Sequence, residues 1–166
     1  MNNFCKYTLF GILFFFLNTT HSQSLKSSFW SENAQGPTLL KGKEVIKADV
    51  FRTVRIDLAE LKKRLINAPH RNQKNGGNNL VIELPHPDGS SAIYEVFENN
   101  TMHPDLKVKF PGIRSYDAIG LNGDFAKIDV TLQGFHAMIL SPQKGSMFID
   151  PYSMAETEFY KVYFKR

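Results

Sequence analysis

The histidines that follow the N-terminal apolar segment are the side chains of this sequence best suited to chemistry. They are His70, His86, His103 and His136, and no two of them have the spacing that places two imidazoles on one metal ion. None is followed by glutamate, so the His-Glu-x-x-His zinc motif is absent. The sequence also lacks a Gly-x-Ser-x-Gly nucleophile motif and the glycine-rich motifs that bind nucleotide phosphates. We therefore expect no catalytic residue, no metal site and no cofactor site.

His136 is the histidine whose role the sequence leaves most open. It lies in the apolar segment 135–140, on the same predicted strand face as Met138 and Leu140. It can be a neutral histidine hydrogen-bonded within a sheet, or it can hold a ligand or transfer a proton. The second interpretation, a hydrolase of unknown type, requires a cleft that brings His136 next to a carboxylate. The acidic residues of the predicted strands lie on polar faces or at strand edges, where we expect water to solvate them: Glu83, Glu95, Asp124, Asp129 and Asp150.

Residues 1–24 have the pattern of a secretory signal peptide. Lys6 precedes an apolar core at 7–17, and the small residues Thr20 and Ser22 follow at a spacing suited to cleavage. The apolar run is too short to span a bilayer comfortably. We therefore expect a secreted or periplasmic product with no stable membrane anchor after cleavage.

Cysteine content and charge exclude several further classes of protein. Cys5 is the only cysteine and precedes the apolar core, so the mature chain is expected to have no disulfide, thiolate metal ligand or cysteine nucleophile. The formal net charge of +4 is scattered along the chain rather than clustered, and this gives no argument for nucleic-acid binding. The mature domain must then be stabilised by its hydrophobic core alone.

The predicted mature chain begins with a polar arm, 25–49, followed by one domain over 50–166. Alternation over 50–57 predicts a strand, and a helix follows at about 57–68. Asp57 can cap this helix with Glu60 three residues on, and Pro69 ends it.

The rest of the predicted domain consists mainly of short strands. A hairpin with Asp88-Gly89 at its tip precedes a meander, and Pro104 and Pro111-Gly112 predict a bend and a short helical turn between them. The expected strands are 80–84, 92–98, 124–132, 135–140, 147–150 and 160–164. The fold class is α+β, mostly antiparallel β, with the single helix covering one face of the sheet.

Several segments occur in an order that resembles a known protein family. They are VFRTVRIDLAELKKRLINAP (50–69), LPHPDGSSAIYEVFENNTMHPDLKVKFPGIRSYDAIG (84–120), AKIDVTLQGFHAMILSP (126–142), MFIDPYS (147–153) and YKVYFKR (160–166). Together they resemble the propeptide region of secreted bacterial zinc metalloproteases of the reprolysin type. The resemblance covers about residues 50–166. It depends on the order of the motifs, since no single one is diagnostic.

The resemblance implies a non-catalytic, prodomain-like module that assists folding of a zinc metalloprotease or keeps it latent. The partner is then the metalloprotease catalytic domain, and the residues that the resemblance offers as contacts are Arg114, Tyr116, Tyr163 and Phe164. The arm and the segment VYFKR (162–166) are further candidates, for contacts made by strand addition. Related precursors continue into a zinc-binding domain where this sequence ends, so neither protease activity nor zinc is expected here. No mature cysteine is present to bind a partner's zinc, and His103 is a poor substitute.

An alternative function is a free-standing secreted module that binds glycans or proteins. Exposed, coplanar aromatic rings on a sheet face would favour this alternative.

Overall fold

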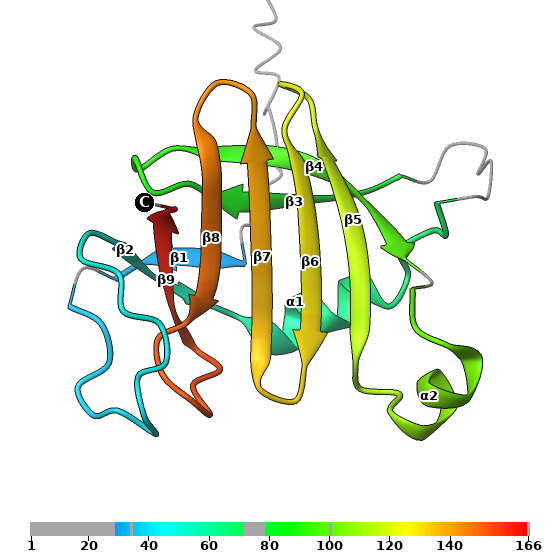
Figure 1. The fold of residues 1–166 in the computed structure, drawn as a ribbon, viewed down its shortest axis with the longest axis horizontal. Coiled ribbons are helices and arrows are strands. Elements are labelled where there is room, and N and C mark those ends of the chain that lie inside the picture. The colour runs from blue at the N-terminus through cyan, green and yellow to red at the C-terminus, as the bar shows by residue number, and fades with distance from the viewer. Residues whose placement is uncertain (1–28, 34, 72–78, 100, 166) are drawn as a thin grey trace, which may run out of the picture.

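The computed structural model describes residues 29–33, 35–71, 79–99 and 101–165. The predicted signal peptide lies outside these residues. The described part contains nine strands and two helices (Figure 1). In chain order they are β1 (Trp30–Glu32), β2 (Arg52–Ile56), α1 (Leu58–Leu65), β3 (Leu80–Pro85), β4 (Ser91–Asn99), α2 (Pro104–Lys109), β5 (Arg114–Gly120), β6 (Phe125–Thr131), β7 (Gly134–Ser141), β8 (Gly145–Pro151) and β9 (Phe159–Phe164).

All nine strands belong to one sheet, with the order β1-β2-β9-β8-β7-β6-β5-β4-β3. Every neighbouring pair is antiparallel. From β3 to β8 the order follows the chain as a meander, and β9 then lies between β8 and β2. The prediction of a mostly antiparallel α+β fold with a hairpin and a meander is confirmed.

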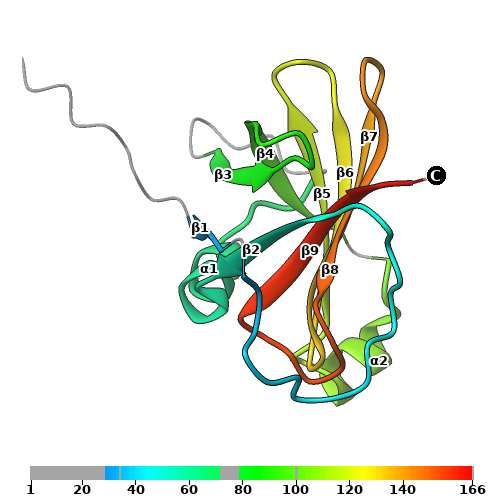
Figure 2. The same cartoon turned by 90° about the vertical axis from the view of Figure 1, so that its left-hand side faces the viewer.

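The sheet curls until its two edge strands come close to each other. In Figures 1 and 2, β1 and β3 both lie on the same side of β5, β6 and β7. The indole Nε1 of Trp30 in β1 donates a hydrogen bond to the carbonyl oxygen of Glu83 in β3, over 2.9 Å. Arg52 Nη1 in β2 donates to the carbonyl oxygens of His86 and Ser90 in the β3–β4 hairpin, over 2.7 and 3.1 Å. Side chains thus join the two edges where the backbone ladder does not.

The inside of this nearly closed sheet is the hydrophobic core. Along β6 and β7 buried residues alternate with less buried ones, as the period of two requires. Trp30 packs edge-on against Phe135 and Tyr160, with ring centroids 5.5 and 5.8 Å apart. The Tyr160 hydroxyl accepts a hydrogen bond from the Phe135 amide at 3.2 Å, and burial raises the pKa of Tyr160 to about 12. Residues from β1, β7 and β9 therefore meet at one point of the core.

Helix α1 confirms the predicted helix, with a shorter extent than 57–68. The Asp57 carboxylate accepts from the Glu60 amide at 3.0 Å, which caps the helix. Leu58, Leu61 and Leu65 are buried on one face of the helix. The regular helix ends at Leu65, and Ile66 and Asn67 form a turn before Ala68-Pro69.

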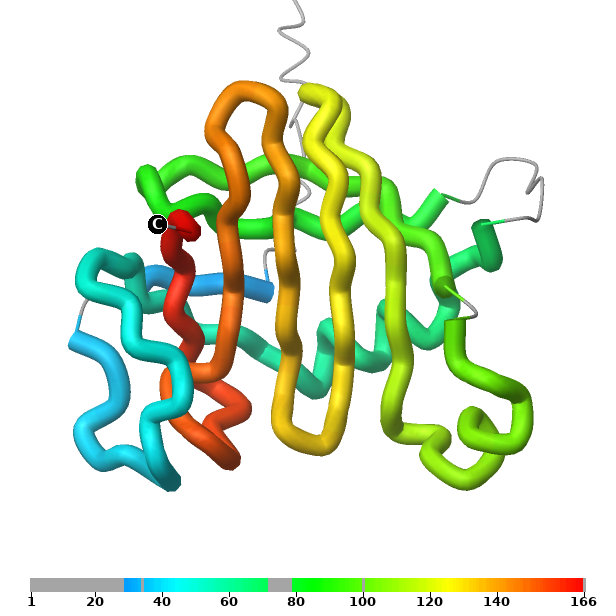
Figure 3. Tube along the Cα trace, viewed as in Figure 1, coloured from blue at the N-terminus to red at the C-terminus, as the bar shows by residue number. Residues whose placement is uncertain are grey.

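The described part of the polar arm packs against the sheet. Met154 donates its amide to the carbonyl oxygen of Lys43 over 2.9 Å. A Cβ on Gly42 would lie 2.5 Å from the Met154 carbonyl oxygen, so only glycine fits this approach. Figure 3 shows the arm running beside β8 and β9. Residues 29–49 therefore contribute an edge strand and a cover to the same domain.

Over its described residues, the segment VYFKR is part of the sheet rather than a free strand. Its first residue, Val162, already pairs with Ile149 of β8 on one side and Arg52 of β2 on the other. Tyr163 and Phe164 continue the pairing with β8. A strand needs unpaired backbone groups to add to another sheet, and β9 uses them to hold its own sheet together.

The bond between Trp30 and Glu83 predicts a measurable loss of stability in Trp30→Phe. Phenylalanine keeps an aromatic ring but leaves the Glu83 carbonyl without its donor. We expect the free energy of unfolding to fall by about 1 to 2 kcal/mol. Urea denaturation measures this, with Leu132→Ala as a control at an exposed turn position. An unchanged midpoint in Trp30→Phe would show that the two edges are held by other contacts.

Candidate functional site

The four predicted contact residues lie at two separate places on the sheet. Arg114 and Tyr116 are in β5, Tyr163 and Phe164 are in β9, and β6, β7 and β8 lie between those strands. Tyr116 is 2% exposed and belongs to the core, where burial raises its pKa to about 12. Arg114 forms an ion pair with Glu98 at 3.4 Å. Of the four residues, Tyr116 has almost no surface on which a partner can bind.

His136 lies next to a carboxylate, which the hydrolase hypothesis requires. His136 Nδ1 is 2.8 Å from Asp150 Oδ1, and the Tyr163 hydroxyl donates to Asp150 Oδ2 over 2.7 Å. Burial, with Asp150 as acceptor, raises the pKa of Tyr163. The Tyr163 ring stacks on Phe148, with centroids 5.6 Å apart and planes inclined by 20°. The sequence predicted Tyr163 as a contact residue but did not reveal its link to His136.

Two hollows flank this cluster, and Ile46 of the arm lines both. The first has a volume of about 190 Å³ and is lined by Val45, Ile46, Gln133, His136, Asp150, Pro151, Ser153 and Met154. The second has about 370 Å³ and is lined by Ile46, Lys47, Ala48, Asp49, Val50, Phe148, Tyr163, Phe164 and Lys165. Each hollow is thus bounded by the arm on one side and by the sheet on the other.

Ser153 completes the set of polar residues around the smaller hollow. It is 2% exposed, and its Oγ has no hydrogen-bond partner in the described residues. A serine nucleophile would be hydrogen-bonded to the histidine that activates it. His136 and Asp150 have the relative geometry of such a site, but the serine–histidine bond is not formed.

A buried lysine fixes the arm above the outer side of β9. Lys161 is 0% exposed, and its ammonium forms an ion pair with Glu44 and donates to the Ile46 carbonyl oxygen at 3.1 Å. The rings of Phe51 and Tyr152 each lie 4.6 Å from the same nitrogen. An ammonium removed from water needs such partners, because an unpaired buried charge is strongly unfavourable. The sequence signal for this arrangement, a lone lysine between apolar residues in YKVYF, was not recognised.

A second buried polar cluster joins three hairpin turns. Lys144, in the turn between β7 and β8, lies 3.2 Å from His86 Nδ1, and His86 Nε2 lies 3.0 Å from the Tyr94 hydroxyl. Tyr94 donates in turn to Asp124 Oδ2 over 3.0 Å. An ammonium only donates and Tyr94 donates to Asp124, so His86 accepts at Nδ1 and donates at Nε2. The hydrogen bonds thus run in one direction, from Lys144 through His86 and Tyr94 to Asp124, and His86 is neutral.

The environment of His86 opposes its protonation. The residue is 1% exposed, and burial followed by the charge of Lys144 lowers its pKa below the ordinary 6.5. Asp124 and Asp88 act in the opposite direction, and Arg52 acts with Lys144. The sequence showed His86 only as part of a turn, because residues far apart in the chain supply every one of its charged neighbours except Asp88.

The outer face of β5 to β8 carries a group of apolar side chains that we call the apolar band. It consists of Ile119, Phe125, Met138, Leu140 and Phe148. Ile119 is opposite Phe125, Phe125 is opposite Leu140, and Met138 is opposite Phe148. Ile119 and Leu140 are each 42% exposed. In Figure 1 no described segment crosses in front of β5, β6 and β7.

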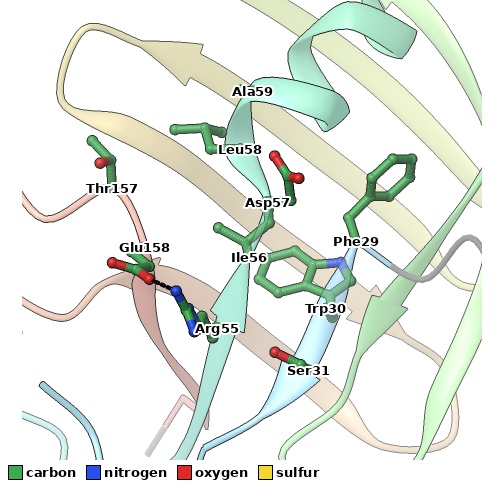
Figure 4. A pocket seen from close by; sticks show the side chains of 10 residues that line it. All are labelled: Phe29, Trp30, Ser31, Arg55, Ile56, Asp57, Leu58, Ala59, Thr157 and Glu158. Atoms are coloured by element: carbon green, nitrogen blue, oxygen red, sulfur yellow. Dashed lines mark ion pairs between the residues drawn. The ribbon is translucent and has the colours of Figure 1, made fainter.

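A third hollow, of about 620 Å³, lies elsewhere, over β1, β2 and the start of α1 (Figure 4). Arg55 and Glu158 face each other across it as an ion pair. The Ile56 amide also donates to the Glu158 carbonyl oxygen over 2.8 Å. Arg55 and Glu158 are thus paired with each other, the Asp57 carboxylate caps α1, and no histidine lines this hollow. The lining residues are Phe29, Trp30, Ser31, Arg55, Ile56, Asp57, Leu58, Ala59, Thr157 and Glu158.

Comparison with protein-family models, with curated proteins and with solved structures gives no match. Within the described residues, no group of three or more histidine, cysteine, aspartate or glutamate side chains is placed to hold a metal ion. In the same part of the chain, no helix has the length and apolar character needed to cross a bilayer. His103 acts as the N-cap of α2, with its Nδ1 3.4 Å from the Asp105 amide.

The neutral state of His86 predicts that stability falls as the medium becomes acidic. The folded chain resists a proton that the unfolded chain binds at pH values near and below 6.5. This contribution is therefore fully present above pH 6.5 and is lost as the pH falls below that value. The loss is about 1.4 kcal/mol for each unit by which the pKa of His86 is lowered. Urea unfolding between pH 8 and pH 5 should give a flatter pH dependence for His86→Gln, and parallel curves would contradict the assignment.

The Lys161 contacts predict that Lys161→Met releases the arm while the sheet stays folded. Methionine keeps an apolar side chain of similar length but cannot bind Glu44 and Ile46. We expect trypsin to cleave after Lys43 and Lys47 at least about tenfold faster than in the unmodified chain, because cleavage follows the population of the open form. Lys127→Met, on the outer face of β6, is the matched control. Equal cleavage of both variants would mean that Lys161 does not hold the arm.

Proposed function

We propose that this chain is a non-catalytic, prodomain-like module that binds a zinc metalloprotease catalytic domain. It assists folding of that domain or holds it latent. The observation that carries the proposal is the apolar band on the outer face of β5 to β8, which no described segment crosses over β5, β6 and β7. Binding to a protein surface gains free energy from burying apolar side chains of this kind.

The motifs behind the family resemblance are consistent with this use of the sheet. Met138 and Leu140 of the band come from the segment GFHAMILSP, which forms β7 in the middle of the exposed face. Ile119 comes from RSYDAIG, which forms β5, and Phe148 comes from MFIDPYS in β8. The segments that resemble a propeptide thus supply four of the five side chains of the band, and Phe125 lies just before one of them.

The buried carboxylates support a structural role more than a catalytic one. Glu98 is paired with Lys107 at 2.7 Å and with Arg114 at 3.4 Å. Glu156 is paired with Lys41 at 3.0 Å, and the same oxygen also accepts from backbone amides. A general acid or base must be free to exchange its proton with a substrate. These groups are engaged in holding loops and the arm to the sheet.

The alternative of a glycan-binding module has weaker support. The aromatic pair on the outer face, Phe148 and Tyr163, is stacked ring against ring. Each ring therefore turns one face to the other ring, whereas a sugar needs a free ring face to pack against.

Binding and inhibition assays on a metalloprotease catalytic domain from the same genome test the proposal. The added chain should slow peptide hydrolysis and form a complex on size-exclusion chromatography. Leu140→Asp places a charge in the apolar band and should weaken binding about tenfold or more. Leu132→Asp makes the same change at a turn position that is 82% exposed, and it should leave binding within about twofold.

A refolding experiment distinguishes a folding assistant from an inhibitor, the two roles that the proposal includes. The denatured catalytic domain is diluted with and without the chain, and recovered activity is measured after the chain has been removed. A higher yield with the chain identifies a folding assistant, and slower hydrolysis without a change in yield identifies an inhibitor. If no complex forms and neither rate nor yield changes, the proposed function is wrong.

A further inference from the structure

The smaller hollow beside His136 has polar groups whose hydrogen-bonding capacity the described residues do not use. His136 bonds to Asp150 through Nδ1, and no bond is formed at Nε2 within the described part of the chain. Ser153 lines the same hollow, and its buried Oγ is also without a partner there. A buried hydroxyl without a partner is unfavourable by about 1 to 3 kcal/mol, so such a group indicates a position where another molecule can bond.

The contact with Asp150 determines whether His136 Nε2 accepts a hydrogen bond from a ligand or donates one to it. An ionised carboxylate only accepts, so Nδ1 of His136 carries the hydrogen in this bond. In the neutral imidazole Nε2 is then an acceptor. Ser153 Oγ can accept as well. The hollow therefore suits a ligand that donates several hydrogen bonds.

The charge around the hollow favours a cation. Asp150 contributes a negative charge, and the Tyr163 hydroxyl bonded to it carries no charge of its own. The buried cation Lys161, which is opposite Asp150 in the register of β8 and β9, is paired with Glu44. A positively charged ligand head would offset Asp150, whereas an anion would be repelled by it.

The remaining walls suit an aliphatic stem. Val45 and Ile46 come from the arm, and Pro151 and Met154 come from β8 and the segment after it. The volume of about 190 Å³ is roughly that of six water molecules in the liquid. An unbranched carbon chain with a small charged end fits this space and these walls.

We propose that this hollow is a binding site for a primary alkylammonium group, the chemistry of a lysine side chain. The ammonium donates to His136 Nε2 and Ser153 Oγ, Asp150 balances its charge, and the stem lies against Val45, Ile46 and Met154. The site does not depend on the proposed protease partner. It is separate from the apolar band, although His136 is on the same face of β7 as Met138 and Leu140.

Nuclear magnetic resonance titration tests the site directly. The isotope-labelled chain at pH 8 is titrated with n-butylammonium and with N-acetyl-lysinamide, both of which are cationic at this pH. Saturable shifts are expected at the His136 imidazole and the Ile46 methyl groups, with a Kd of the order of 1 mM, as is usual for ligands of so few atoms. N-acetyl-norleucinamide has the stem without the charge and should bind at least about tenfold more weakly. Binding by both amines indicates recognition of the ammonium and its stem, and binding by the lysine derivative alone adds recognition of a peptide backbone.

Two variants and two controls determine whether the amines bind in this hollow. Asp150→Asn removes the charge and should weaken binding of n-butylammonium about tenfold. Val45→Trp fills the hollow from its exposed rim and should abolish binding without touching the polar cluster. Leu39→Trp, at another exposed position of the arm, and Asp105→Asn, at an exposed position of α2, should both bind as the unmodified chain does. The proposal is overturned if neither amine binds, if norleucinamide binds equally well, or if Val45→Trp retains binding.

Discussion

The fold depends on one constraint: a sheet of nine strands has two edges, and both are brought together on the same side of the molecule. An unpaired sheet edge is a site of unwanted association, which proteins avoid by covering or closing it. Here the closure is made by side chains, since Trp30 reaches the Glu83 carbonyl and Arg52 reaches two carbonyls of the β3–β4 hairpin. The same curvature encloses the core and turns the outer face of β5 to β8 towards the solvent.

The polar groups of this domain are arranged to attach peripheral segments to that sheet. Lys161 attaches the arm, and the series from Lys144 to Asp124 connects three turns. Buried charges of this kind add little net stability, because their desolvation offsets much of their attraction. Their main effect is to favour one conformation of the attached segments over others. His136 and Asp150 differ from these groups, because the histidine keeps one nitrogen free beside a hollow.

Local patterns in the sequence predicted most of the strands and the capped helix, since alternation and turn residues act over a few positions. They did not predict that β9 lies between β8 and β2, because pairing partners distant in the sequence leave no periodic signal. The same limit applies to the site. The sequence predicted Tyr163 as a surface residue and left His136 open, but Asp150, Ser153 and Ile46 join them only through the register of β7, β8 and β9 and the path of the arm. Lys161 and His86 were overlooked because most of their interaction partners are distant in the sequence. Neither a lysine in an apolar strand nor a histidine in a turn shows from its neighbours which groups it contacts.

The position of β9 also has a consequence for biosynthesis. The hairpin of β1 and β2 is connected to the meander of β3 to β8, within the sheet, only through Phe159–Phe164. A nascent chain can form the meander early, but it cannot complete the sheet until that strand has left the ribosome. Assembly must therefore wait for a contact between residues about a hundred positions apart, and such distant contacts slow folding. Until then the first hairpin has no strand to pair with on the β9 side of β2.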